Sequence, residues 1–112
     1  MIEVVWDAVA LHTSRGIVER KRPEIALVSA GAGADVVGLG VAQLPKEVVA
    51  QVIAAFPRLG FKKTYQKVLA EIVARKPETA MGNFLASVGE RHVPGYKAPN
   101  FCDLMDAAPF AD

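Results

Sequence analysis

One long run of apolar and small residues, Ile25 to Leu44, constrains the fold more than any other segment of the chain. Pro23 and Glu24 stand just before it. Both suit the first turn of a helix, because proline lacks the amide that would stay unpaired there and glutamate faces the positive end of the helix dipole. The sequence therefore predicts a helix from Pro23 to about Gly38. This helix is apolar all round, so we expect it to be central.

Two glycines, Gly31 and Gly33, fall inside this predicted helix. Each weakens a helix by about 1 kcal/mol relative to alanine. We expect a neighbouring helix or a bound group to approach closely at these positions and offset the loss.

Asp35 is the only charged residue of the apolar run. A buried charge without a partner costs many kcal/mol, so this carboxylate must be paired, protonated or bound to a metal. The run has the length of a membrane span, about 20 residues. A carboxylate in mid-membrane is expensive, however, so we expect no membrane span.

His12 ends a second apolar segment, the predicted helix from Ile2 to Thr13. Val5, Ala8, Val9 and His12 follow the i, i+3, i+4, i+7 spacing, which predicts that His12 shares the inward face. His12 and Asp35 would then form an imidazole and carboxylate pair on consecutive buried helices. Such a pair can ligate a divalent metal, or one member can orient the other. Residue chemistry alone favours a third interpretation, a core histidine satisfied by a nearby carboxylate.

Further helices are predicted along the rest of the chain. They run from Pro45 to Phe56, from Phe61 to Arg75, from Thr79 to about Glu90, and from Phe101 to about Ala108 after an Asn100 cap. We expect the third of these to bury Met81, Phe84, Leu85 and Val88. No alternating strand pattern occurs, so the sequence predicts a single all-α domain over residues 1–112 with about five to six helices.

The amino-acid composition limits the kinds of partner that the chain is expected to bind. With 52% hydrophobic and 22% charged residues the chain is expected to be globular. A net charge of +1 argues against nucleic-acid binding, and the basic stretch from Arg15 to Arg22 is expected to be a solvated loop. The single cysteine, Cys102, excludes an internal disulfide, is expected to act as a small hydrophobe, and fits a reducing cytoplasm. No signal-peptide pattern is present.

Two other patterns have ordinary explanations. Ile25 to Ser29 followed by Gly31 and Gly33 suggests a strand and a phosphate-binding turn, but Val36 stands where the dinucleotide fingerprint needs a small residue. His92 lies at the predicted end of a helix, where the dipole favours a protonated imidazole, so a capping role is expected.

Several short blocks, taken in order, resemble the HD-domain metal-dependent hydrolases, and most closely their cyanamide-hydratase-like branch. The blocks are Trp6 to Ile17, Arg22 to Val28, Gly33 to Gly38, Glu90 to Tyr96 and Asn100 to Leu104. The resemblance spans nearly the whole chain. It implies an all-α bundle whose metal is held by an early histidine, an adjacent His-Asp doublet and a later aspartate on a buried helix.

By this resemblance Asp35 matches the later metal-binding aspartate. His12 matches a histidine that lines the site or binds a second metal, and it is the predicted catalytic residue. The implied cofactor is a divalent ion such as zinc, iron or manganese. In the family this ion activates water to attack phosphorus or the nitrile carbon of cyanamide, so a small nitrile or phosphate ester is the implied substrate.

The chain departs from the family pattern at the doublet. His12 precedes Thr13 and His92 precedes Val93, so neither histidine is followed by aspartate. The doublet and the early histidine would lie before Met1, which makes the chain similar to the C-terminal half of such a domain. One carboxylate and one imidazole are too few for a catalytic metal, so we expect no activity from the chain alone. The alternative is a non-catalytic, truncated or diverged helical module that forms a homo-oligomer through exposed apolar helices.

Overall fold

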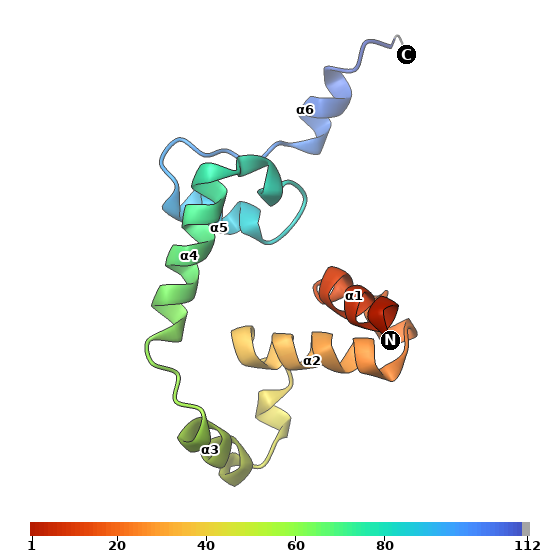
Figure 1. The fold of residues 1–112 in the computed structure, drawn as a ribbon. Helices are drawn as coiled ribbons and strands as arrows, with labels where there is room; N and C mark the ends of the chain where they lie inside the picture. Colours follow the sequence, from red (N-terminus) through yellow and green to blue (C-terminus); the bar gives the residue numbers. More distant parts are fainter. Residues whose placement is uncertain (111–112) are drawn as a thin grey trace. The chain divides into compact units, whose positions relative to one another are not determined.

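The computed structural model describes residues 1–110, which contain six α-helices, short 3-10 helices and no strand (Figure 1). The predicted all-α class and helix number are confirmed. The chain divides into two compact units, Met1–Arg58 and a second that begins at Leu59. Each unit is described by itself, and the single domain over residues 1–112 stays a prediction.

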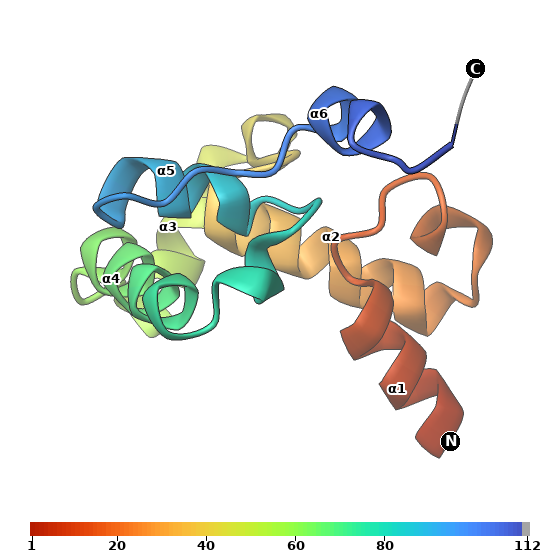
Figure 2. The same ribbon diagram turned by 90° about the horizontal axis from the view of Figure 1, so that it is seen from above.

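The first unit contains α1 (Ile2–Leu11), α2 (Pro23–Val37) and α3 (Lys46–Ala55), with the 3-10 helices η1 (Val18–Arg20) and η2 (Val41–Gln43). In Figure 2, α1 lies against the beginning of α2, and η1 packs on α2 as well. The core of this unit consists of Ala8, Val18 and Ile25, with Val4 and Leu11 packed against it. It is a small core for three helices.

The predicted bounds of α2 are close to the observed ones. Pro23 opens the helix, and the pKa of Glu24 is held below its ordinary value by a hydrogen bond from its own backbone amide and then by the Arg22 guanidinium. At the other end Gly38 adopts φ 75°, a left-handed conformation that glycine adopts without strain. Its amide donates to the Ala34 carbonyl at 3.0 Å. This left-handed cap ends the helix at the predicted glycine.

The expectation that α2 is central is wrong. Only Ile25 is buried in it, whereas Leu27 and Val37 keep 70% and 68% of their surface exposed. The reason is that α1 and η1 are short and cover a single side of the helix. No helix within residues 1–110 combines the length and apolar character needed to cross a bilayer.

The two helical glycines of α2 differ from each other. An added Cβ at Gly31 would have no atom within 4 Å, so no neighbouring helix of the described residues approaches closely there. At Gly33 the Cβ would lie 3.0 Å from Leu39 Cδ1. The approaching group is therefore the loop that follows α2, whose Leu39 amide also donates to the Gly33 carbonyl at 3.1 Å, and it is not a neighbouring helix.

The second unit contains α4 (Phe61–Arg75), η3 (Pro77–Ala80), α5 (Leu85–His92) and α6 (Phe101–Asp106). The α4 bounds are those that the sequence predicts. α4 packs against both α5 and η3, and Val73, Ala80 and Gly89 are buried between them. An extended segment leads from α5 to α6 (Figure 2). Asn100 caps α6 as predicted, with Oδ1 accepting from the Cys102 amide at 2.8 Å, and the helix ends at Asp106.

The predicted start of the next helix at Thr79 is wrong, since α5 begins only at Leu85. Gly82 adopts φ 70°, and the Asn83 side chain donates to the Thr79 carbonyl at 2.7 Å and accepts from the Leu85 amide at 2.9 Å. The turn at Gly82 and Asn83 therefore interrupts the predicted helix, and α5 starts after it, at Leu85. Met81 and Phe84, which were expected in the core, stay 60% and 50% exposed.

Candidate functional site

Asp35 lies near the end of α2 and is paired with an arginine. Its side chain is 57% exposed, and its Oδ1 accepts from Nη1 of Arg58. Nη2 of the same guanidinium donates to the Asp35 backbone carbonyl at 2.8 Å. Of the three states that the sequence allows, the structure shows the paired one, and the expected burial is wrong. Sequence reasoning missed Arg58 because it lies 23 residues away, in the turn after α3.

His12 directly follows α1 and is exposed, so its predicted place on the inward face is wrong. The face of α1 that packs on α2 is formed by Val4, Ala8 and Leu11, while Val9 keeps 65% of its surface exposed. The inward face is thus displaced around the helix from the predicted one. The imidazole Nδ1 lies 2.7 Å from the carbonyl of Val9.

The structure does not bring the two predicted site residues together. The His12 carbonyl accepts from the Ser29 hydroxyl at 2.7 Å, which joins the end of α1 to the middle of α2. From Ser29 to Asp35 the helix advances about 9 Å and turns by about 240°, so the two positions lie on different sides of it. Within residues 1–110 no hydrogen bond or ion pair joins the His12 side chain to Asp35.

A divalent metal does not fit the residues that the structure describes. No group of three or more His, Cys, Asp or Glu side chains in this part of the chain is placed to hold an ion. Zinc sites in proteins use three or four protein ligands, and one oxygen of Asp35 already accepts from a guanidinium. Any metal site built on Asp35 therefore needs ligands from another polypeptide segment.

Two further residues of the sequence analysis lie in the second unit. His92 is the last residue of α5, as predicted, but its Nε2 lies 3.2 Å from Oε1 of Gln66 on α4. Cys102 is exposed on α6, so its expected packing as a small hydrophobe is wrong. Neither residue forms part of a metal or nucleophile cluster among the described residues.

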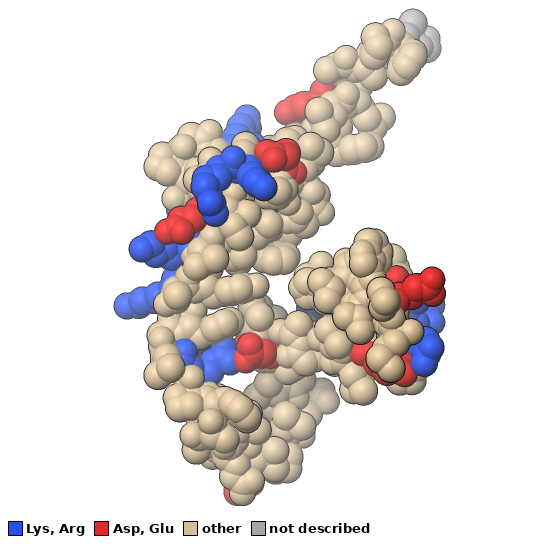
Figure 3. Space-filling model, viewed as in Figure 1, with Lys and Arg blue, Asp and Glu red and all other residues tan. Residues whose placement is uncertain are grey.

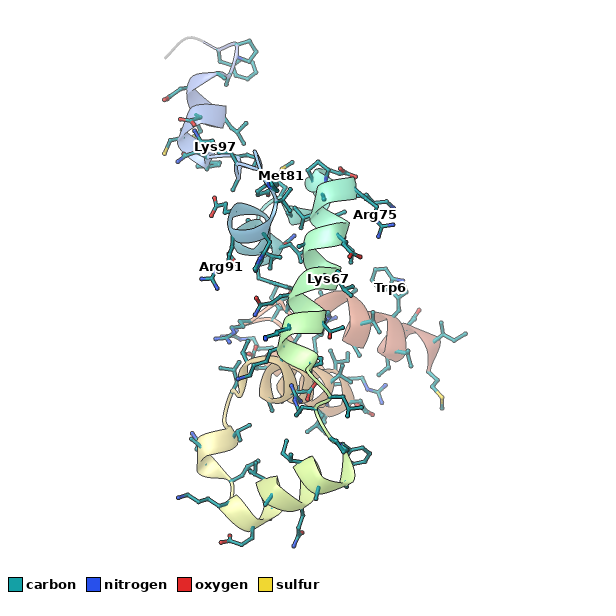
Figure 4. The ribbon with its side chains drawn as sticks, turned by 90° about the vertical axis from the view of Figure 1, so that its left-hand side faces the viewer. Trp6, Lys67, Arg75, Met81, Arg91 and Lys97 are labelled. Carbon is teal, nitrogen blue, oxygen red and sulfur yellow. The ribbon has the colours of Figure 1, made fainter. Side chains whose placement is uncertain are left out.

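The first unit leaves many large apolar side chains uncovered. Trp6 projects from α1 and is 68% exposed (Figure 4), and α3 buries none of its residues. Val48, Val52, Ile53 and Phe56, which form the apolar stripe of α3, all remain exposed. Five of the exposed apolar residues of α1 and α2 are called the open apolar residues: Val5, Trp6, Val9, Leu27 and Val28.

The solvent-accessible surface area of the chain is also large for its mass. The chain exposes 9258 Å². Two separately folded units of half its mass would together expose about 7,200 Å² by the scaling for compact proteins. The excess of about 2,000 Å² on one chain is more than the roughly 800 Å² per partner that a standard protein interface buries.

Comparison with known protein families, curated proteins and solved structures finds no match to this chain.

Proposed function

We propose that this chain is the C-terminal portion of a metal-dependent hydrolase of the HD type, similar to the cyanamide-hydratase-like branch. The observation that carries the proposal is the uncovered apolar surface of α1 and α2 together with Asp35 on the same helix. In a complete domain, further helices would pack on the open apolar residues and bring the His-Asp doublet to this carboxylate. The proposed substrate is a small nitrile or phosphate ester, and the proposed location is the cytoplasm.

The residues of this chain would have limited roles in such an enzyme. Asp35 would give one carboxylate oxygen to a divalent ion, which supplies an activated water when bound. Since the guanidinium of Arg58 holds Oδ1, Oδ2 is the oxygen that would face the ion. His12 contacts Val9 through Nδ1, which leaves Nε2 as the nitrogen that would line the site. By itself the chain is proposed to be inactive.

Metal analysis with Asp35→Asn tests the proposal. In a longer gene product that carries a His-Asp doublet, we expect one bound metal ion per chain and at least about tenfold weaker metal binding after the substitution, since a lost ligand costs no less than a lost second-shell partner. Asp7→Asn is the matched control, because Asp7 is also a surface carboxylate in an ion pair, with Lys21 at 2.9 Å.

The same two variants separate metal binding from folding. Exposed ion pairs contribute about 0 to 1 kcal/mol, so both substitutions should leave the unfolding of the chain nearly unchanged. Equal metal binding by the wild-type and Asp35→Asn forms would contradict the proposal. So would an upstream reading frame without a His-Asp doublet.

A non-catalytic, self-associating module is the second candidate, and the excess surface of about 2,000 Å² favours it because it is ample for the roughly 800 Å² that a standard dimer covers on each partner. Under this proposal light scattering after size exclusion gives twice the chain mass, and Val9→Asp weakens the dimer at least about tenfold by placing a charge in an apolar contact. Thr64→Asp, at an exposed position of α4, is the control. A monomer at every concentration would exclude this candidate.

A further inference from the structure

The second unit has a cavity of about 460 Å³ whose lining includes none of the predicted site residues. Val73 of α4, Met81 and Val93 form apolar parts of its wall, with three prolines, while Glu78 and Lys97 are its charged residues. This volume lies within the usual range of pockets that take ligands, about 300 to 1,000 Å³. The cavity can therefore accept apolar side chains near a lysine.

One polar group in the wall lacks a partner. The hydroxyl of Tyr96 is buried and makes no hydrogen bond within the described residues. Buried hydroxyl groups are normally paired, so this hydroxyl is an exception among the groups of the wall.

The same unit also carries an apolar stripe that has nothing to pack on. Phe101, Leu104 and Met105 follow the i, i+3, i+4 spacing on α6 and are 72%, 56% and 60% exposed. Figure 1 shows α6 projecting away from α4 and α5. The helix is well defined at its start, where the Asn100 side chain caps it.

The body of the second unit and its tail carry opposite net charges, while the cavity wall itself holds one acidic and one basic residue, Glu78 and Lys97. From Leu59 to Lys97 the chain has seven Lys and Arg residues and three Glu, whereas residues 98–110 have two Asp and no Lys or Arg. Over α4 and α5 several Lys and Arg side chains lie with acidic ones between them, and acidic side chains also lie on α6 (Figure 3). Lys97 lines the cavity with Met81, and both lie at the α6 end of the unit (Figure 4). The apolar stripe of α6 therefore suits the apolar part of this wall, and its acidic residues suit Lys97 and the excess of Lys and Arg between Leu59 and Lys97.

We propose that α6 of one chain docks into the cavity of a second copy of this chain. Phe101, Leu104 and Met105 enter the cavity, and Asp103 and Asp106 lie beside Lys97 and the neighbouring Lys76. The contact goes beyond the proposed function, which concerns the first unit. Reciprocal docking of two tails gives a closed, two-fold symmetric pair.

The backbone before α6 explains why the partner is a second copy. Pro99 lines the cavity, and α6 begins only two residues later. Asn100 is extended, with φ −88° and ψ 131°, and its side chain holds the first turn of α6. This short, capped connection directs the helix away from the cavity of its own chain, so its apolar stripe stays exposed until another copy covers it.

Sedimentation equilibrium of the full chain with charge-swapped variants tests the proposal. One variant carries Lys76→Glu and Lys97→Glu, and the other carries Asp103→Lys and Asp106→Lys. Each variant alone should associate about tenfold more weakly than the wild type, because like charges then meet. An equimolar mixture of the two should recover the association, because the cavity of the first fits the tail of the second.

Leu104→Asp supplies a second measurement, with Cys102→Ser as the control on the same exposed helix. We expect the former to weaken association at least about tenfold and the latter to leave it unchanged. Val9→Asp, on the first unit, should also leave this contact unchanged, which separates it from dimerisation through α1 and α2. Unchanged association of Leu104→Asp, no recovery in the mixture, or a monomer whose tail occupies its own cavity would each overturn the proposal.

Discussion

Gly89→Ala should lower the stability of the second unit by about 1 to 3 kcal/mol, the usual cost of overpacking a core. An added Cβ would lie 2.6 Å from both Cδ1 and Cε1 of Tyr96 and 2.9 Å from Cγ1 of Val73. Val73 is fully buried and cannot move aside, so the Tyr96 ring must leave its place over α5. This loss exceeds the gain of about 1 kcal/mol that alanine brings to a helix.

Urea unfolding followed by far-UV circular dichroism measures this effect. Gly31→Ala is the matched control, because Gly31 is also helical and an added Cβ there meets nothing within 4 Å. The control should raise the stability of the first unit by about 0.5 to 1 kcal/mol. A Gly89→Ala protein as stable as the wild type would show that Tyr96 does not pack on α5 as described.

Ile25→Ala should remove about 2 to 5 kcal/mol from the stability of the first unit, as large-to-small changes in cores do. Ile25 is 2% exposed and packs with Ala8 and Val18, and few other side chains of this unit are buried. Since the core is so small, its largest member holds α1, η1 and α2 together. We therefore expect the first unit of this variant to be largely unfolded at room temperature.

Thermal unfolding followed by the helix signal, with Trp6 fluorescence as a probe of the first unit, measures the Ile25→Ala effect. Leu27→Ala is the control on the same helix, since Leu27 is 70% exposed. An exposed substitution of this kind changes stability by no more than about 0.5 kcal/mol. Similar losses from the two substitutions would contradict the described core.

The ends of the helices were predicted well where a glycine, a proline or a capping residue bounds them. α4 begins after Gly60, which adopts φ 77°, and ends before Pro77, so both ends follow from residues with special backbone preferences. The start of α6 at Asn100 and the end of α2 at Gly38 are further helix ends that follow from such residues. The prediction for the segment around Gly82 was wrong because its turn residues lie within a helical spacing of apolar residues.

Predictions that depend on which other segment of the chain packs against a residue were wrong more often. Periodicity shows which residues of a helix share a side, but it does not show which side another element covers. For α1 the packed side contains Val4 and Leu11, and His12 lies outside it. The partner of Asp35 was missed for the same reason, because the turn that places Arg58 is not visible in the spacing around Asp35.

The exposed apolar side chains of α1, α2 and α3 also determine how the chain responds to temperature. Covering apolar surface has a large negative heat-capacity change and is driven mainly by entropy near room temperature. Any helix or second copy that covers Trp6 and its neighbours will therefore be held more weakly on cooling. An association of this kind is cold-sensitive, so a preparation studied only on ice would underestimate what the chain binds.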